Sequence, residues 1–203
     1  NSILPAAGQN QKWFALFFIQ KMKGVGKIAT TGIWKIEKRL DNVIDYTTNI
    51  EKTINSDYCK DSYYDLHNVI DYVEADYKTE KQFYVSGVNC NPKTALEEMT
   101  ITKEQYGKTG GILGFHAFQS FAEGEVTPEQ CHAIGVRLAE EMWGDRFEVV
   151  VSTHLNTNHY HNHFVINSVS FKDGKRYYDK RETYAELRRL SDSLCEEYGL
   201  SVL

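Results

Sequence analysis

The sequence predicts an α+β fold in which a central antiparallel sheet is flanked by helices. Segments that alternate apolar and polar residues, as strands do, outnumber the helical segments that could connect parallel strands. The chain has 203 residues, 41% hydrophobic and 25% charged, which is the composition of an ordinary globular domain. No internal repeat and no linker rich in proline divides it. One domain with a mixed set of elements is therefore expected.

The first expected elements are a strand and a helix. Residues 28–36 read as a strand because Trp34 and Ile36 recur at period two with Ile28 on the same side. Directly after it, the residues that recur at helical spacing are Leu40, Val43 and Ile44.

The second pair of elements lies between residues 83 and 99. Residues 83–88 are expected to form a strand. Asn91 and Pro92 then mark the start of a short helix. The residues of this helix expected to face the core are Ala95, Leu96 and Met99.

The best-marked helix begins after Thr127. Residues 112–121 are first expected to form a strand, which glycines precede. The order Thr127-Pro128-Glu129-Gln130 is then a capping box with proline at the first helical position. On the strand, one face is expected to carry His116, Phe118 and Ser120, and the helix is expected to bury Ile134, Leu138 and Met142.

The C-terminal part predicts a strand pair and a last helix. Residues 147–154 and 161–170 read as strands joined by a short polar loop. Asp173-Gly174 is a tight-turn signal. A helix over 182–198 then ends at Gly199. Its core-facing residues are expected to be Tyr184, Leu187, Leu190 and Leu194.

A cluster of histidines joins the two C-terminal strands. Four of the seven histidines lie in the decapeptide HLNTNHYHNH, residues 154–163. His161 and His163 are two residues apart, so on a strand both imidazoles project from one face. His154 ends the preceding strand. If the residues between form the connection, the strands pair antiparallel and bring His154 beside the other two.

Three imidazoles on one face indicate a metal site. As neutral ligands they can bind a first-row divalent ion and leave coordination positions open, and zinc, manganese, nickel and cobalt all suit them. His159 is expected to be a loop residue or a hydrogen-bond partner of the ligands. The alternative interpretation is a set of surface histidines that binds nothing.

Other features exclude several classes of protein. The four cysteines form no CxxC pair, which excludes a zinc ribbon or a disulfide scaffold and predicts reduced thiols. The longest apolar run, residues 13–19, is too short to span a membrane, and no secretory signal is present, so a cytoplasmic protein is expected. The net charge of −5 argues against coating duplex DNA through bulk electrostatics. Residues 171–189 are locally basic, which suits either a phosphate contact or a solvated face.

The histidine block HLNTNHYHNHFVIN resembles the third motif of conjugative relaxases of the MobA/MobL mobilisation type, in the HUH endonuclease superfamily. Two more blocks carry the resemblance, RLDNVIDYTTNIEKT at residues 39–53 and GFHAFQSFAEGEVTPEQ at residues 114–130. It implies an HUH-type α+β relaxase domain over residues 29–203, the N-terminal part of a longer protein. Residues 1–28 are expected to be an extension of uncertain origin.

The resemblance implies a specific reaction. In this family a tyrosine attacks one phosphodiester at the nick site of a transfer origin, leaves a free 3′-hydroxyl and keeps the 5′-phosphate as a phosphotyrosine ester. By this resemblance Tyr46 is the expected nucleophile, and His154, His161 and His163 hold one divalent ion. Mn²⁺ or Mg²⁺ is expected, with Zn²⁺, Ni²⁺ or Co²⁺ as alternatives.

The same blocks supply candidates for supporting and DNA-binding roles, namely Arg39, Lys52, His116, Ser120, Glu125 and Asn156. Many relatives carry Asp at the position of Asn156, so a charged partner of the ligands is missing there. The implied partners are single-stranded or hairpin origin-of-transfer DNA, an accessory relaxosome protein and a secretion coupling protein. The implied location is the bacterial cytoplasm, with translocation to the recipient cell alongside the DNA.

Two other functions remain open on the sequence. A rolling-circle replication initiator shares the histidine block, and a non-catalytic, metal-stabilised DNA-binding module would use the histidines only for structure. An ordinary zinc hydrolase fits least, because HExxH and related signatures are absent.

Overall fold

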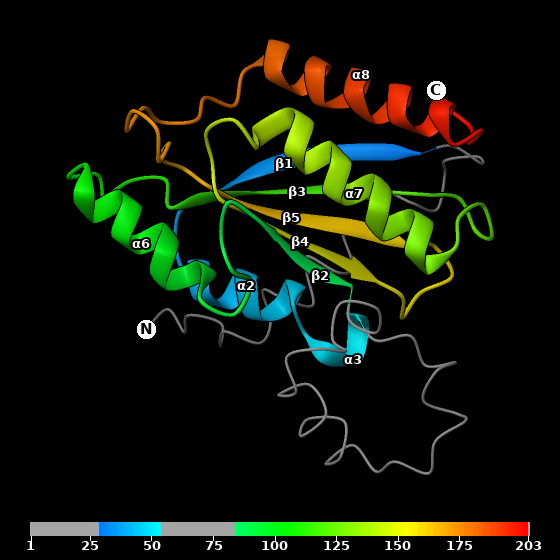
Figure 1. Ribbon diagram of the computed structural model, residues 1–203, viewed down its shortest axis with the longest axis horizontal. Helices are drawn as coiled ribbons and strands as arrows, with labels where there is room; N and C mark the ends of the chain where they lie inside the picture. The colour runs from blue at the N-terminus through cyan, green and yellow to red at the C-terminus, as the bar shows by residue number, and fades with distance from the viewer. Residues whose placement is uncertain (1–28, 54–83, 203) are drawn as a thin grey trace, which may run out of the picture.

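The fold is a five-stranded antiparallel sheet covered by helices on both faces (Figure 1). The computed structural model describes residues 29–53 and 84–202. The strands are β1 (Thr30–Ile36), β2 (Val85–Val88), β3 (Gly114–Ser120), β4 (Val149–His154) and β5 (His161–Asn167). The helices are α2 (Leu40–Thr47), α3 (Ile50–Thr53), α6 (Ala95–Gln105), α7 (Pro128–Trp143) and α8 (Arg181–Glu197).

The strand order is β1-β3-β5-β4-β2, and every neighbouring pair is antiparallel. Strand β5 therefore lies at the centre, and all seven of its residues are buried. Because both faces of the central strands are covered, these strands carry no solvent-facing polar positions. The predicted fold class is confirmed.

Two separate apolar clusters hold the layers together. Helices α7 and α8 lie together on one face of the sheet, where Ile134, Leu138 and Leu187 pack on Phe164 and Ile166. Helices α2 and α6 lie on the opposite face (Figure 1), where the second cluster joins Ile44 and Met99 to Val150 and Val165. The second cluster is the smaller one, and polar residues occupy the rest of that face.

The capping box of α7 forms as the sequence predicts. The Thr127 hydroxyl accepts a hydrogen bond from the Gln130 backbone N–H, and the Gln130 side chain accepts one from the Thr127 N–H. Ile134 and Leu138 are fully buried, whereas Met142 is half-buried.

Two residues expected in the core are exposed. Leu96 is 39% exposed, because Ala95 and Met99, four residues apart, already form the buried stripe of α6 and the next residue points about 100° away. Tyr184 is 37% exposed, and its hydroxyl donates to the Thr31 carbonyl at 3.2 Å. The helix at 95 also begins after Thr94 rather than at Asn91.

Several elements are shorter than the sequence suggests. The strand expected over 83–88 begins at Val85, and residues 83 and 28 lie outside the described part of the chain. The turn at Gly174 forms, with φ +67°, but a single bridge between Val169 and Arg176 replaces a longer hairpin. A Cβ atom on Gly174 would lie 2.4 Å from the Tyr106 ring, so both the backbone and the packing require glycine here.

Two further expectations concern the thiols and the membrane. Cys90, Cys131 and Cys195 are free thiols, as predicted, and Cys59 lies outside the described residues. None of the described helices combines the length and the apolar character that a membrane span needs.

Candidate metal centre and its tyrosine

Sheet register brings three histidines to one end of one face. His154 is the last residue of β4 and pairs directly with His161, the first residue of β5. His163 lies two residues further along β5 and therefore shares the face of His161. The predicted convergence of the three imidazoles is present.

The three rings are in contact. Their centroids lie 4.3 Å apart for His154–His163, 4.9 Å for His161–His163 and 5.2 Å for His154–His161. One potential ligand nitrogen from each ring lies within 4.8 Å of the other two. All three residues are buried, so the arrangement is not a set of surface histidines.

Burial keeps these imidazoles neutral. It lowers the pKa of His154 to about 3 and that of His161 to about 4, and it also lowers the pKa of His163 well below its usual value. Neighbouring positive charge adds to the effect in each case. At neutral pH each ring therefore offers one N–H donor and one lone pair.

Hydrogen bonds fix which nitrogen carries the lone pair. A backbone carbonyl only accepts, so His154 donates from Nε2 to the Thr47 carbonyl at 2.9 Å, and its lone pair is on Nδ1. His161 donates from Nδ1 to the His159 carbonyl at 2.8 Å, which leaves the lone pair on Nε2. His159 thus acts through its backbone, and its own side chain bonds to the Phe121 carbonyl.

The third histidine is oriented by another imidazole. His163 Nδ1 lies 2.9 Å from Nε2 of His116, a buried residue of β3. If His163 donates in this contact, its Nε2 carries the lone pair, as in His161. Partners that orient the ligands in this way are a regular feature of metal sites in proteins. His116 therefore joins the cluster, as the strand parity suggested.

A divalent ion fits this set of donors. Each of the three neutral imidazoles offers one ligand nitrogen, and these nitrogens lie within 4.8 Å of one another, as ligands of one first-row divalent ion do. Through their other ring nitrogens, His154 and His161 donate to backbone carbonyls, and His163 contacts the His116 imidazole. The histidines His154, His161 and His163 are thus the residues that would bind the ion.

Tyr46 lies against the cluster. It is near the end of α2, and its ring centroid is 5.7 Å from that of His154 and 6.1 Å from that of His163. Burial raises the pKa of Tyr46. The Lys52 ammonium lies 3.3 Å from the centroid of the Tyr46 ring, and burial lowers the pKa of this lysine. The first sequence block therefore delivers both a phenol and a cation to the histidines.

Two serine hydroxyls flank the histidines on neighbouring strands. Ser120 of β3 pairs with His161, and Ser152 of β4 pairs with His163, so both lie on the histidine face. Each is buried, and neither hydroxyl has a hydrogen-bond partner among the described residues. Sequence reasoning had selected Ser120 but missed Ser152, which the run VVVSTH hides inside an apolar strand.

The other three candidates have different surroundings. Arg39 is exposed at the far end of α2 and pairs with Asp41 at 2.9 Å. Glu125 accepts hydrogen bonds from the backbone N–H groups of Ala122 and Ser201, which ties the loop before α7 to the C-terminal segment. Asn156 is exposed in the loop between β4 and β5.

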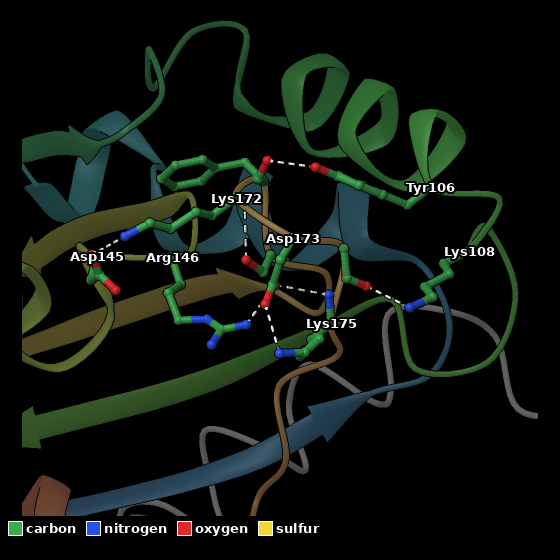
Figure 2. A network of polar contacts seen from close by, with 10 residues as sticks. Tyr106, Lys108, Asp145, Arg146, Lys172, Asp173 and Lys175 are labelled. Carbon is green, nitrogen blue, oxygen red and sulfur yellow. Dashed lines mark hydrogen bonds and ion pairs between the residues drawn. The ribbon is translucent and has the colours of Figure 1, made fainter.

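The basic segment after β5 begins at the opposite end of the sheet. β5 runs from His161 to Asn167, about 20 Å at 3.3 Å per residue, so the turn around Lys175 is a strand length from the histidines. Figure 2 shows two of its lysines engaged there: Lys175 contacts Asp173, which also pairs with Arg146, and Lys172 contacts Asp145. Among these side chains the charges are already paired, which favours a structural role.

The chain is similar to proteins of the relaxase family. The model of the relaxase family described as MobA/VirD2-like, nuclease domain, matches residues 49–200, three quarters of the chain, and its match begins just after Tyr46. The chain is 43% identical over 117 residues, 58% of its length and 37% of the relative's, to Protein rlx of Staphylococcus aureus. It is 28% identical over 186 residues to the group II intron-interrupted relaxase LtrB of Lactococcus lactis, covering 82% of this chain and 32% of that one.

The curated relatives are longer, and the chain spans about a third of their length. A solved structure described as the molecular basis of vancomycin resistance transfer in Staphylococcus aureus has the same fold, with a TM-score of 0.54. At 12% identity it covers 86% of this chain and 96% of its own. That likeness bears on the fold alone.

Proposed function

The chain belongs to the MobA/VirD2-like relaxase nuclease family, and on that premise we propose that it nicks and rejoins one DNA strand at a transfer origin. This reaction would start conjugative transfer of a mobile element. The observation that carries the proposal is the contact of the Tyr46 ring with His154 and His163. A half-buried phenol and a cation beside three buried, neutral imidazoles suit phosphoryl transfer to tyrosine.

The proposed step is a transesterification. The Tyr46 oxygen attacks the phosphorus of one phosphodiester, a phosphorus–oxygen bond to tyrosine forms, and the bond to the 3′-oxygen breaks. The phenol proton is lost to a base or water, and the departing 3′-oxygen is protonated. The 5′-phosphate stays on Tyr46 as an ester. In the reverse direction the 3′-hydroxyl attacks that ester and restores the strand, with no net change in the number of ester bonds.

Lys52 is proposed to assist the nucleophile. Burial raises the pKa of Tyr46, which opposes formation of the phenolate that must attack. The ammonium of Lys52, 3.3 Å from the ring centroid, favours negative charge at the phenol and on an incoming phosphate. Burial also lowers the pKa of Lys52, which disfavours its charged form. An incoming phosphate would favour that charged form.

His154, His161 and His163 are proposed to hold one divalent ion, Mn²⁺ or Mg²⁺ first. Such an ion supplies Lewis-acid neutralisation of charge on the phosphate oxygens. The side chains keep the ion in place through the nitrogens identified above, and His116 holds His163 in orientation. The buried hydroxyls of Ser120 and Ser152 border the same space and are candidates for contacts to phosphate oxygens.

The proposed substrate is single-stranded or hairpin DNA, because a phosphodiester must reach the half-buried Tyr46 beside the histidines. An acidic chain in which Lys52 is the cation placed at this cluster among the described residues is suited to grip a short strand rather than a long duplex. An accessory relaxosome protein and a secretion coupling protein are the proposed partners. The proposed place of action is the bacterial cytoplasm, from which the protein would accompany the DNA into the recipient.

The test is a search for the covalent adduct. The chain is incubated with Mn²⁺ and a pool of single-stranded oligonucleotides of randomised sequence, labelled at either end. Because the protein retains the 5′-phosphate, only the 3′-label should migrate with the protein on a denaturing gel. Tyr46→Phe should retain metal and DNA binding and form no adduct. Adduct formation by this variant at the wild-type rate would exclude Tyr46, and DNA binding without any adduct in the wild type would favour a non-catalytic module.

A further inference from the structure

Polar residues occupy the reverse face of the histidine strands, where an apolar core is expected. Gln119, Thr153 and Asn162 alternate with the residues of the histidine face and are all fully buried. They pack under α7 and α8, in the larger apolar cluster. A buried polar group is destabilising unless it is hydrogen-bonded, so the partners of these three residues matter.

The side chains form one continuous chain of hydrogen bonds across the sheet. The distances are 2.8 Å for Ser86–His132, 2.8 Å for His132–Thr153, 2.6 Å for Thr153–Asn162, 3.1 Å for Asn162–Gln119 and 2.9 Å for Gln119–Ser191. It links β2, α7, β4, β5, β3 and α8. The chain therefore crosses directly beneath the three histidines.

Donor and acceptor chemistry gives this chain a single direction. The Asn162 amide lies 2.8 Å from the Cys131 carbonyl, which can only accept, so Nδ2 faces that carbonyl and Oδ1 faces Thr153. Thr153 must donate to Oδ1 and hence accepts from His132 Nδ1, which leaves His132 Nε2 to accept from Ser86. Burial lowers the pKa of His132 to about 4, in agreement with a neutral ring.

Asn162 is the junction of this network. It lies between His161 and His163 in sequence, and its amide reaches β3, β4 and the backbone of α7. Gly135 of α7 lies against it: a Cβ atom there would come within 2.5 Å of the Asn162 amide nitrogen. A glycine inside a helix is less favourable than alanine, so its presence here is explained by the close approach of Asn162.

We propose that Asn162 is a positioning residue for the metal centre, which holds β5 in the register that makes the three imidazoles converge. A slip of one residue would move His161 and His163 to the other face, and it would also leave the partners of Asn162 unsatisfied in the core. The proposal rests on the proposed function in one respect, namely that the three histidines bind a metal ion.

Substitutions of similar shape at two positions of β5 test the proposal. Asn162→Leu removes the hydrogen bonds and retains the branching of the side chain. Asn167→Leu is the matched control, because Asn167 is also fully buried and also bonds to a helix carbonyl, that of Met99, at the other end of the strand. In the 203-residue chain, Co²⁺ affinity and the visible spectrum of the bound Co²⁺ are measured beside the urea midpoint. Asn162→Leu should weaken Co²⁺ binding about tenfold or more and alter the spectrum, whereas Asn167→Leu should leave both unchanged.

The outcomes separate positioning from general stability. If both variants weaken Co²⁺ binding in proportion to their loss of stability, or if Asn162→Leu binds Co²⁺ like the wild type, the proposal is wrong. Thr153→Val, which deletes only the hydroxyl that links His132 to Asn162, provides the same comparison should Asn162→Leu not fold. If the wild type does not bind Co²⁺, or if binding survives His163→Ala, the metal assignment is wrong. The positioning role is then wrong as well.

Discussion

The two ends of the β4–β5 strand pair both bury polar residues, but in opposite ways. At one end, the buried Glu148 carboxylate accepts hydrogen bonds from Thr102 and Asn167, and the Lys103 ammonium donates to the Met99 carbonyl. At the other end, His154, His161 and His163 bring lone pairs toward one another. At the first end the buried carboxylate and the ammonium bond to partners within the protein, whereas the second end gathers acceptors.

This difference indicates which end is functional. Buried polar groups in proteins are satisfied by protein or solvent partners, and at the Glu148 end both the carboxylate and the Lys103 ammonium have partners within the protein. Converging imidazole lone pairs suit a cation from outside the chain. The histidine end also has the nucleophile candidate Tyr46 and the cation Lys52 beside it. We therefore expect changes at the two ends to affect different properties.

The largest effect is expected from removal of one imidazole. His161→Ala leaves two ligands, so Mn²⁺ affinity should fall by more than about a hundredfold and adduct formation should cease. Titration with Mn²⁺ and the denaturing gel measure both. His159→Ala is the matched control within the same block: His161 uses only the backbone carbonyl of His159, so metal affinity should persist. Wild-type metal content in His161→Ala would remove that residue from the ligand set.

A smaller effect is expected from loss of the cation over Tyr46. Lys52→Met retains the length of the stem but removes the charge, so single-turnover adduct formation should slow by about tenfold to a hundredfold, with metal affinity near that of the wild type. Lys103→Met is the same substitution at the opposite end of the strand pair. It should leave the rate unchanged, and equal rates for the two variants would show that the position of Lys52 over the ring has no catalytic consequence.

The sequence predicts local features of this molecule well. The capping box of α7 depends on residues 127–130 alone, and the parity of His161 and His163 follows from the strand period. The antiparallel pairing of His154 with His161 also follows, because only six residues join the strands. Such features are set by contacts within one turn or one hairpin.

Contacts between distant segments could not be predicted in the same way. The position of the Lys52 ammonium over the Tyr46 ring, the imidazole pair of His116 and His163, and the burial of Ser152 depend on how helices dock on the sheet. The one sequence signal for the network below the histidines was polarity itself, since Thr153 and Asn162 stand where a buried strand would carry apolar residues.

The smallest effect concerns the other end and the pH. Burial lowers the pKa of Lys103 from 10.5 to about 8, so the folded protein releases this proton before the unfolded chain does. Between these two pH values the unfolded state binds more protons, and the free energy of unfolding contributed by Lys103 rises with pH, by at most about 1.4 kcal/mol per pH unit. Urea unfolding between about pH 8 and about pH 10 should show this rise in the wild type and not in Lys103→Met.

A rise in the unfolding free energy with pH distinguishes Lys103 from an exposed surface lysine. If the difference in unfolding free energy between wild type and Lys103→Met stays constant over this pH range, the ammonium is not desolvated. Metal affinity should not respond to this substitution at any pH, because Lys103 lies at the end of the strand pair opposite to the three histidines.

We expect the histidine end to bind a cation and the Glu148 end to bind none. Anomalous diffraction from crystals of the chain soaked in Mn²⁺ tests it directly. We expect one peak within about 2.5 Å of His154 Nδ1, His161 Nε2 and His163 Nε2, next to the Tyr46 ring, and no peak at Glu148. A peak at Glu148, or none at the three imidazoles, would contradict it.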